Sequence, residues 1–362
     1  MNKTLLIFGT RPELIKVAPI IHEYERRSIR DSLLIIHSNQ HNTLLEQDLI
    51  DFNIKPDYQV DLDRKGPDLS ELVGSLLLEF NGLLSKLIQN SINIDSIISQ
   101  GDTATTYCSA LIAFHSKIPF YHIEAGLRTN DILDPFPEEF YRKSISVMAS
   151  FHFTPSQLAY KNLINEGVDS KMILNTGNTV IDNLEKYYSK EKPIKKREAL
   201  ITLHRRTSKQ SNRVKYLEYF KSLADNNKSW KFKWLNHPGA EFKSNEFEKH
   251  ENIQVMKPVS LRQFLQLYEE TSIVYTDSGG IQEEAAYLGI PCVVARGKTE
   301  RIEGINCGVS SLLDINVLNV SNQLEKFDQN KLTFKNELYG DGKSAERIVT
   351  KILELKKLLP VE

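Results

Sequence analysis

The stretch Ser272–Gly289, SIVYTDSGGIQEEAAYLG, constrains the fold of this 362-residue chain more than any other. Its apolar run Ile273–Tyr275 ends in a polar turn, and apolar residues at helical spacing follow. This pattern predicts a strand, a tight turn and the start of a helix. Gly279 and Gly280 let the backbone approach a ligand, and the amides at a helix start favour an anion. Glu284, one turn into the helix, is placed to accept hydrogen bonds from two ribose hydroxyls. The pattern also fits an ordinary capped helix start.

The same alternation of apolar runs and helical patterns recurs along the whole chain. In the first half, the predicted strands are residues 5–8, 33–36, 95–98, 119–123 and 151–154. In the second half, they are residues 199–203, 232–235, 273–275 and 291–295. Strands that alternate with helices predict parallel, doubly wound sheets, and the length fits two domains. We therefore expect an α/β protein with two Rossmann-like domains facing across a cleft, residues 1–170 and 171–344.

The composition excludes several classes of protein. Forty-six basic and 47 acidic side chains give a net charge of −1, which provides no general attraction to nucleic acid or to an anionic membrane. Cys108, Cys292 and Cys307 have no paired spacing, which indicates a reducing compartment and argues against a zinc site. The apolar part of the N-terminus is too short for a signal peptide, and no apolar run approaches the roughly 20 residues that span a bilayer. We expect a cytoplasmic protein with no bound metal and no membrane or nucleic-acid partner.

Basic groups follow several predicted strands, as a diphosphate site would need. The candidates are Arg11, Lys16, Arg205, Arg296 and Arg301, together with the amides of Ser278, Gly279 and Gly280. Surface salt bridges are the alternative interpretation of each arginine taken alone. The first strand is followed by Gly-Thr-Arg-Pro rather than GxGxxG, and no GxxxxGK[ST] loop occurs. Neither a nicotinamide cofactor nor P-loop ATP hydrolysis is therefore expected.

A set of carboxylates at successive strand and helix ends is the second chemical signal. Asp102, Glu124, Glu138 and Glu139 should share one rim, because ligands of parallel sheets bind beyond the carboxyl ends of the strands. Crowded carboxylates raise each other's pKa, which suits acid or base catalysis near neutral pH. Glu138 and Glu139 are also typical of a helix N-terminus, whereas Asp102 and Glu124 precede no evident helix start. His204 could bind a phosphate or protonate a leaving group, or be a buried, hydrogen-bonded histidine.

Ten segments spread over almost the whole chain carry a resemblance to a known family. They are FGTRPELIK (Phe8–Lys16), QH (Gln40–His41), QGDTATT (Gln100–Thr106), HIEAGLRT (His122–Thr129), PFPEEFYR (Pro135–Arg142), TGNTVIDNL (Thr176–Leu184), HRR (His204–Arg206), TDSGGIQEEA (Thr276–Ala285), TERIEG (Thr299–Gly304) and YGDG (Tyr339–Gly342). In this order they resemble the non-hydrolysing UDP-N-acetylglucosamine 2-epimerases.

The resemblance implies a fold like that of the GT-B glycosyltransferases, with the last helix, residues 345–362, packing on the first domain. It implies an isomerase that interconverts UDP-N-acetylglucosamine and UDP-N-acetylmannosamine. UDP would leave by anti elimination to give 2-acetamidoglucal and add back so that C2 is inverted, with no cofactor. It also implies a homodimer that supplies sugar nucleotide for a surface polysaccharide.

The resemblance also implies roles for individual residues. Asp102, Glu124 and Glu138 would be the acid and base carboxylates, with His204, the fourth catalytic candidate, and Arg11 at the diphosphate. The other predicted residues of the UDP-sugar site are Lys16, Arg142, Arg205, His237, Ser278, Gly279, Gly280, Glu284 and Arg301. Gln40 and His41 would belong to a site for a second, activating substrate molecule, together with Arg205 and His237.

The chain departs from the family pattern at several positions of these motifs. Asn42 replaces an arginine, Tyr141 an asparagine, Leu203 a glycine, Thr207 a glutamate and Ile302 a proline. These changes leave open activation by a second substrate molecule and the same chemistry on another UDP-2-acetamido sugar, such as a deoxy or uronic acid derivative. A GT-B glycosyltransferase, a non-catalytic nucleotide-sugar binder and a hydrolysing epimerase are further alternatives. A transferase needs one base and an acceptor groove, so three carboxylates favour the epimerase.

Overall fold

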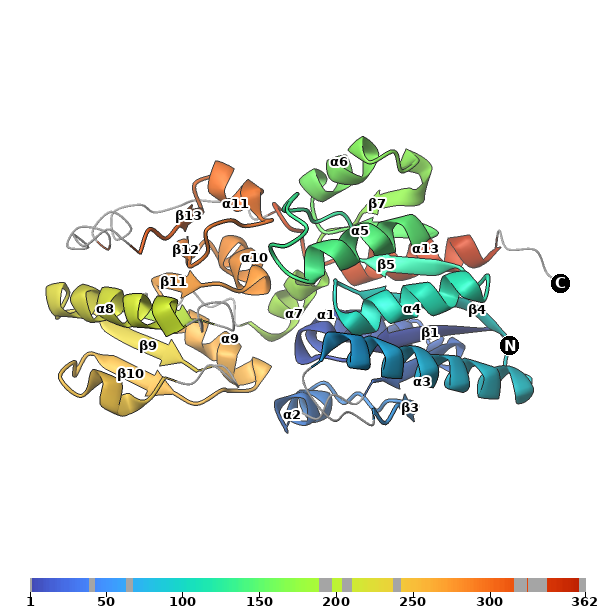
Figure 1. Cartoon of the computed structure of the whole chain (residues 1–362), viewed down its shortest axis with the longest axis horizontal. Coiled ribbons are helices and arrows are strands. Elements are labelled where there is room, and N and C mark those ends of the chain that lie inside the picture. The colour runs from blue at the N-terminus through green and yellow to red at the C-terminus, as the bar shows by residue number, and fades with distance from the viewer. Residues whose placement is uncertain are drawn as a thin grey trace. The chain divides into compact units, whose positions relative to one another are not determined.

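The computed structural model describes residues 2–38, 43–62, 68–188, 197–203, 210–236, 242–315, 324 and 337–357 of the chain. The chain forms two compact units (Figure 1): Met1–Asn183 with Tyr339–Glu362, and Leu184–Leu338. Each unit holds one parallel sheet with helices packed against it.

In the described part of the first unit, seven parallel strands pair in the order β3-β2-β1-β4-β5-β6-β7. The strands are β1 Lys3–Phe8, β2 Leu33–His37, β3 Tyr58–Gln59, β4 Ile94–Gln100, β5 Phe120–Ile123, β6 Phe151–Thr154 and β7 Ile173–Asn175. The order reverses between β1 and β4, and the carboxyl ends of strands at such a reversal are where doubly wound sheets bind ligands.

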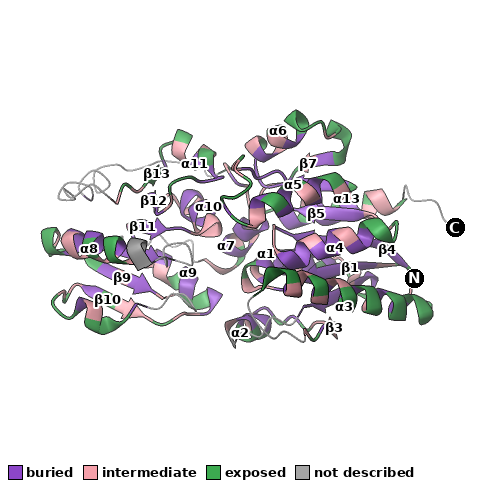
Figure 2. Cartoon of the chain, viewed as in Figure 1, coloured by how far each residue is buried: buried purple, intermediate pink, exposed green. Residues whose placement is uncertain are grey.

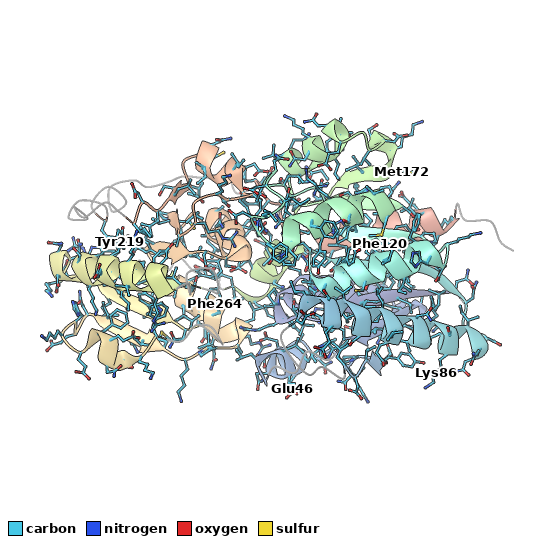
Figure 3. The ribbon with its side chains drawn as sticks, viewed as in Figure 1. Glu46, Lys86, Phe120, Met172, Tyr219 and Phe264 are labelled. Carbon is cyan, nitrogen blue, oxygen red and sulfur yellow. The ribbon has the colours of Figure 1, made fainter. Side chains whose placement is uncertain are left out.

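The helices of the first unit pack on the sheet in two layers. They are α1 Arg11–Arg26, α2 Thr43–Asp51, α3 Leu69–Gln89, α4 Ala104–His115, α5 Glu138–Met148, α6 Gln157–Asn165, α7 Thr179–Tyr187 and α13 Ser344–Lys357, with short 3₁₀ turns η1 Arg30–Ser32 and η2 Ser170–Met172. Helix α4 contacts α3 and α5 in one layer, and α1 contacts α13 in the other. Phe120, labelled in Figure 3, is one of the large side chains fully buried in this unit.

The second unit repeats this topology, with its strands in the order β10-β9-β8-β11-β12-β13 among the described residues. The strands are β8 Glu198–Thr202, β9 Lys231–Leu235, β10 Ile253–Met256, β11 Ile273–Thr276, β12 Cys292–Val294 and β13 Ser310–Leu312. The helices are α8 Gln210–Asn226, α9 Leu261–Glu270, α10 Gly279–Leu288 and α11 Ile302–Asn306, with the 3₁₀ turn η4 Ser244–Phe247. The order reverses between β8 and β11, so the stretch Ser272–Gly289 lies at the switch point of this sheet.

Burial explains why the strands of both sheets are continuous apolar runs in the sequence. The strands β1, β4, β8 and β11 are buried along nearly their whole length (Figure 2), because helices cover both faces. In the second unit the Phe220 ring meets Trp234 and Tyr275 edge-on, with centroids 5.1 and 5.2 Å apart. These rings fill the space between α8 and the sheet.

The boundary between the units differs from the one expected at residues 170 and 171. Strand β7 pairs with β6 of the first sheet through His152 and Ile173, so residues 171–183 belong to the first unit. The chain returns to that unit at Tyr339, where α13 packs on α1. The guanidinium of Arg27, the residue that follows α1, donates to Thr350 Oγ1 of α13 at 2.7 Å. Within the described ranges, no helix is long and apolar enough to cross a membrane.

Candidate functional site

The carboxyl ends of β1, β4 and β5 bring the first set of predicted residues together. Glu124 directly follows β5 and has a φ of +65°, in the left-handed region that side chains other than glycine rarely adopt. Gly101 follows β4, and a Cβ added there would lie 3.7 Å from Glu124 Oε2. Asp102, the next residue, follows β4 at the same carboxyl edge of the sheet. Backbone strain of this kind costs about 1–3 kcal/mol and gathers at functional sites.

Hydrogen-bond donors surround both oxygens of the Glu124 carboxylate. Lys16 Nζ of α1 lies 2.6 Å from Oε1 and 2.7 Å from Oε2. Asn178 Nδ2 donates to Oε1 at 2.9 Å, and Gln100 Nε2 of β4 donates to Oε2. A carboxylate with an ammonium and two amides as donors is stabilised in its ionised form.

Asp102 is held by an arginine on α5. Arg142 Nε and Nη2 lie 2.7 and 2.6 Å from Asp102 Oδ2. Arg142 Nη1 also pairs with Glu139 at 3.1 Å, and the Glu139 carboxylate accepts the backbone N–H groups of Thr129 and Asn130. The fully buried Glu139 thus orients Arg142 and the loop before α5. Its neighbour Glu138 is half-buried at the first position of α5.

Asp102 and Glu139 share Arg142 as a partner, whereas Glu124 pairs with Lys16. One sequence expectation is wrong: Asp102 does precede a helix start, because Thr103 caps α4 and its hydroxyl accepts the Thr106 N–H at 3.2 Å. Helix α4 was not predicted, because its first turn carries threonines in place of an apolar stripe.

A neutral histidine fixes the turn between Gln100 and Asp102. Burial lowers the pKa of His122 to about 4, so its ring is uncharged at neutral pH. His122 Nε2 lies 2.8 Å from the Gly101 carbonyl oxygen, and since a carbonyl only accepts, Nε2 carries the proton. His122 therefore anchors the backbone between two site residues.

Arg11, predicted to bind the diphosphate, is the first residue of α1. Its Nε pairs with the buried Asp48 of α2 at 2.6 Å. Beside it, the buried Glu13 carboxylate accepts the Gly9 and Thr10 amides at 3.1 and 2.6 Å and the Thr103 hydroxyl at 2.7 Å. Burial raises the pKa of Glu13 above its usual range. These contacts fix the Gly-Thr-Arg-Pro turn to the end of β4.

The second unit holds its predicted residues at the start of α10. Ser278 is the N-cap residue, and Gly279 and Gly280 form the first turn. The buried Arg301 guanidinium lies against this turn: a Cβ on Gly279 would come within 2.4 Å of it. Glu283 holds Arg301 Nε at 2.9 Å, and Glu300 pairs with its Nη1. A guanidinium beside the amides at a helix start suits a phosphate.

Glu284, predicted at the ribose, is buried on the same helix. The Tyr268 hydroxyl of α9 donates to Glu284 Oε2 at 2.6 Å. Burial, with Glu284 adjacent, raises the pKa of Tyr268 well above its usual value, so the phenol stays a donor. Tyr268 thereby fixes the orientation of this carboxylate.

Five predicted residues, Gln40, His41, His204, Arg205 and His237, lie outside the described residues. Conversely, Gln100, Asn178 and Tyr268 contact predicted site residues without having been assigned a role. Two sequence features could have identified the first two of these residues: Gln100 lies at a strand end, and Asn178 lies in the TGN segment. For Tyr268 the sequence offered none.

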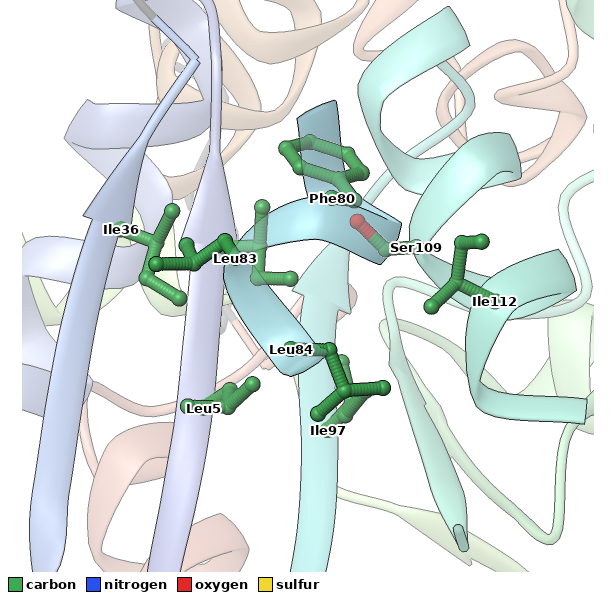
Figure 4. Close-up of a pocket in the computed structure, with 9 residues that line it drawn as sticks. Leu5, Ile36, Phe80, Leu83, Leu84, Ile97, Ser109 and Ile112 are labelled. Atoms are coloured by element: carbon green, nitrogen blue, oxygen red, sulfur yellow. The ribbon is translucent and has the colours of Figure 1, made fainter. Parts of the chain in front are cut away.

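The pocket in Figure 4 is separate from these residues. It lies among β1, β2, β4, α3 and α4 and is lined by apolar side chains such as Leu5, Phe80 and Ile97. Its polar member, Ser109, donates its hydroxyl to the Thr105 carbonyl at 2.7 Å. The pocket is part of the apolar core. Among the described residues, no three His, Cys, Asp or Glu side chains are placed to hold a metal ion.

Comparison with known proteins identifies the family. The family model described as UDP-N-acetylglucosamine 2-epimerase matches residues 23–353. A Campylobacter jejuni UDP-N-acetylglucosamine 2-epimerase is 34% identical over 98% of each chain. Among solved structures, S. aureus MnaA in its co-structure with UDP has a TM-score of 0.86 at 30% identity, over 99% of this chain and 98% of that one.

The Neisseria meningitidis UDP-GlcNAc 2-epimerase, solved bound to UDP-GlcNAc, has a TM-score of 0.84 at 30% identity, over 97% of this chain and all of that one. These likenesses confirm the predicted α/β fold with two Rossmann-like, GT-B-like units. They also confirm the resemblance drawn from the ten sequence segments. The chain belongs to the UDP-N-acetylglucosamine 2-epimerase family of isomerases.

Proposed function

We propose that the protein inverts C2 of a UDP-2-acetamido sugar, converting UDP-N-acetylglucosamine to UDP-N-acetylmannosamine. The observation that carries this proposal is the strained Glu124, whose carboxylate is held by Lys16, Gln100 and Asn178. An ionised, oriented carboxylate is the group needed to take a proton from carbon. The family membership and the relative solved with UDP-GlcNAc support this choice of substrate.

The proposed reaction needs both a base and stabilisation of the departing UDP. A carboxylate takes the C2 proton while the bond between C1 and the phosphate oxygen breaks, and the electron pair of the C–H bond forms the C1=C2 double bond of 2-acetamidoglucal. UDP then adds back to C1 while a proton is delivered to the opposite face of C2. Asp102, Glu124 and Glu138 are the proposed acid and base groups, and no electrons are gained or lost.

Basic and amide donors would hold the UDP part. We assign the amides of Gly279 and Gly280, with Arg301 behind them, to a phosphate, and Glu284 to the ribose hydroxyls. Arg11 and His204 are proposed at the diphosphate, where positive charge stabilises the developing negative charge on UDP. Arg11 would then exchange or share its Asp48 partner.

The test is turnover without an acceptor. Purified protein is incubated with UDP-N-acetylglucosamine alone and followed by proton NMR. The proposal predicts a new anomeric signal from the manno epimer. The final ratio of the two epimers should be the same whichever epimer is supplied at the start. Turnover only when an acceptor is added would instead indicate a glycosyltransferase. Turnover only with a deoxy or uronic acid analogue would keep the chemistry and change the substrate.

Cleavage of the C1–O bond can be checked separately. Substrate carrying ¹⁸O in the oxygen between C1 and the β-phosphorus is recovered before equilibrium. If UDP departs, rotation of its phosphate moves the label into the other β-phosphate oxygens, which shifts the phosphorus NMR signal. Retention of the label in the bridging position during epimerisation would contradict elimination.

A further inference from the structure

Asn178 connects the Glu124 carboxylate to two other parts of the chain. Its side chain is buried, and Nδ2 donates to Glu124 Oε1 at 2.9 Å while Oδ1 accepts the Val180 N–H at 3.1 Å. Its backbone N–H donates to the Tyr339 carbonyl at 2.6 Å. The side chain is therefore fixed at both ends and has one orientation in which Nδ2 meets the carboxylate.

The position of Asn178 in the chain gives these contacts their significance. It immediately precedes α7, the helix along which the chain passes from the first unit to the second after Asn183. Tyr339 begins the segment that returns to the first unit. These two segments are called the crossings here, because the chain passes between the units along them. They lie against each other, since a Cβ on Gly177 would come within 2.7 Å of Gly340 Cα. Asn178 is thus the point where both crossings and Glu124 meet.

Helix α7 also holds the segment of α1 that carries the other main donor to Glu124. Thr179 Oγ1 donates to the Lys16 carbonyl at 2.5 Å, and Asn183 Nδ2 donates to the Ile15 carbonyl at 2.6 Å. Lys16 Nζ is nearly equidistant from the two oxygens of Glu124, at 2.6 and 2.7 Å. It therefore compensates the negative charge of the carboxylate but does not determine the orientation of the carboxylate plane. The two amides, Asn178 on Oε1 and Gln100 on Oε2, fix the plane.

We propose that Asn178 is a positioning residue that sets the plane of the Glu124 carboxylate and keeps it ionised. This inference rests on the proposed function of Glu124 as a catalytic carboxylate and deepens it. Asn178 acts on the reaction through Glu124. The alternative is that Asn178 only joins the two crossings, in which case its loss would lower stability and leave the carboxylate unchanged.

A matched pair of alanine variants separates these roles. Asn178→Ala removes the donor to Glu124, and Asn252→Ala removes a part-buried amide that donates to backbone carbonyls in the second unit, outside the proposed site. Asn178→Ala is expected to lower kcat by about 10- to 100-fold, a part of the roughly 10²- to 10⁴-fold that general acid–base catalysis contributes, with KM changed less than about threefold. Asn252→Ala is expected to lower the melting temperature and leave kcat within about twofold of wild type.

An isosteric variant tests the ionisation with little risk to folding. In Asn178→Asp one oxygen can still accept the Val180 N–H, but the other replaces a donor with a second carboxylate next to Glu124. Lys16, which is paired with Glu124, is shared by both carboxylates in the variant. Like charges raise the pKa of one group, so the acidic limb of the kcat/KM profile should move up by about one pH unit.

A measurement independent of turnover distinguishes this inference from the proposed function. Carboxyl ¹³C NMR of glutamate-labelled protein, with the Glu124 signal assigned by its loss in Glu124→Gln, gives the titration midpoint directly. A rise of this midpoint by about one pH unit in Asn178→Asp supports the inference even if UDP-N-acetylglucosamine is not the substrate. An unchanged midpoint in Asn178→Asp, or an unchanged kcat in Asn178→Ala of an active enzyme, overturns it.

Discussion

At the scale of single residues, the site depends on how each carboxylate is paired. Glu124 and Asp102 were foreseeable as candidates because they end predicted strands. Their partners were not, since Lys16 and Asn178 are separated from Glu124 by 108 and 54 positions in the chain. The local sequence pattern specifies which residues lie at the carboxyl edge of a sheet. Tertiary packing determines which hydrogen-bond donors contact them there.

Replacing the central carboxylate should abolish most of the activity. Glu124→Gln keeps the shape but removes the base, so kcat/KM is expected to fall by about 10²- to 10⁴-fold, with UDP still bound. Steady-state kinetics and calorimetric titration with UDP measure the two effects. Glu198→Gln is the control, because Glu198 is a buried partner of Lys233 in the second unit, outside the proposed site. Equal activity losses in both variants would contradict the assignment.

The neutral His122 gives a prediction for stability against pH. Its pKa of about 4 in the folded protein lies below the unfolded value of about 6.5, so the unfolded state binds a proton first as the pH falls. Stability from this group is present above pH 6.5 and is lost between about pH 6.5 and 4. Between pH 7 and 5 wild type should lose about 2 kcal/mol more free energy of unfolding than His122→Gln. Urea titrations at both pH values measure this difference, and parallel losses would contradict the neutral histidine.

At the scale of elements, α1 contains an internal proline whose cost is offset by α7. Pro19 has no N–H to donate to the Ile15 carbonyl one turn earlier. The Asn183 amide supplies that donor at 2.6 Å. The sequence marks Pro19 as an interruption, but the helix continues through it because a distant side chain satisfies the carbonyl.

A double-mutant cycle tests this compensation. Asn183→Ala should cost about 1–3 kcal/mol of unfolding free energy in wild type, because a buried carbonyl loses its donor. In the Pro19→Ala background the new N–H can serve Ile15, so the same change should cost about 1 kcal/mol less. Chemical denaturation of the four proteins gives the coupling. Identical costs in both backgrounds would rule the compensation out.

The two glycines at the start of α10 differ in the space around them. A Cβ on Gly279 would meet the buried Arg301 guanidinium at 2.4 Å, whereas one on Gly280 has nothing within 4 Å. Gly279→Ala is therefore expected to destabilise the protein by about 1–3 kcal/mol, because the paired guanidinium must shift. Gly280→Ala should not destabilise it, since alanine favours helix. Thermal unfolding compares the pair, and the reverse order of stability would contradict the close contact between Gly279 and Arg301.

The strength of the local pattern decided which elements could be predicted. Helix α3, Leu69–Gln89, and strand β6, Phe151–Thr154, have the bounds expected from their apolar spacing. Strands β10 and β13 were missed because they have four and three residues and exposed positions. Such short strands are defined by their neighbours' hydrogen bonds rather than by their own composition.

At the scale of the whole molecule, the repeated topology was predictable and the boundary was less so. Both sheets follow the alternation read from the sequence, but α7 continues without a break across the division at Asn183. A boundary inside a helix leaves no glycine, proline or change of composition to mark it. The division is visible only once β7 pairs with the first sheet.

The homodimer inferred from the family resemblance remains a prediction. Sedimentation equilibrium at micromolar concentration should give about twice the chain mass of 41.5 kDa. A mass equal to one chain over the whole concentration range would contradict it.

The most direct test of the central claim is the fate of the C2 hydrogen. UDP-N-acetylglucosamine is incubated with the protein in D₂O, and both the recovered substrate and the product are analysed by proton NMR. If a carboxylate removes that proton and solvent exchanges with it, the manno epimer carries deuterium at C2 and so, with time, does the gluco epimer. Epimer formed with the original hydrogen still at C2 would contradict proton removal by an exchangeable carboxylate at this site.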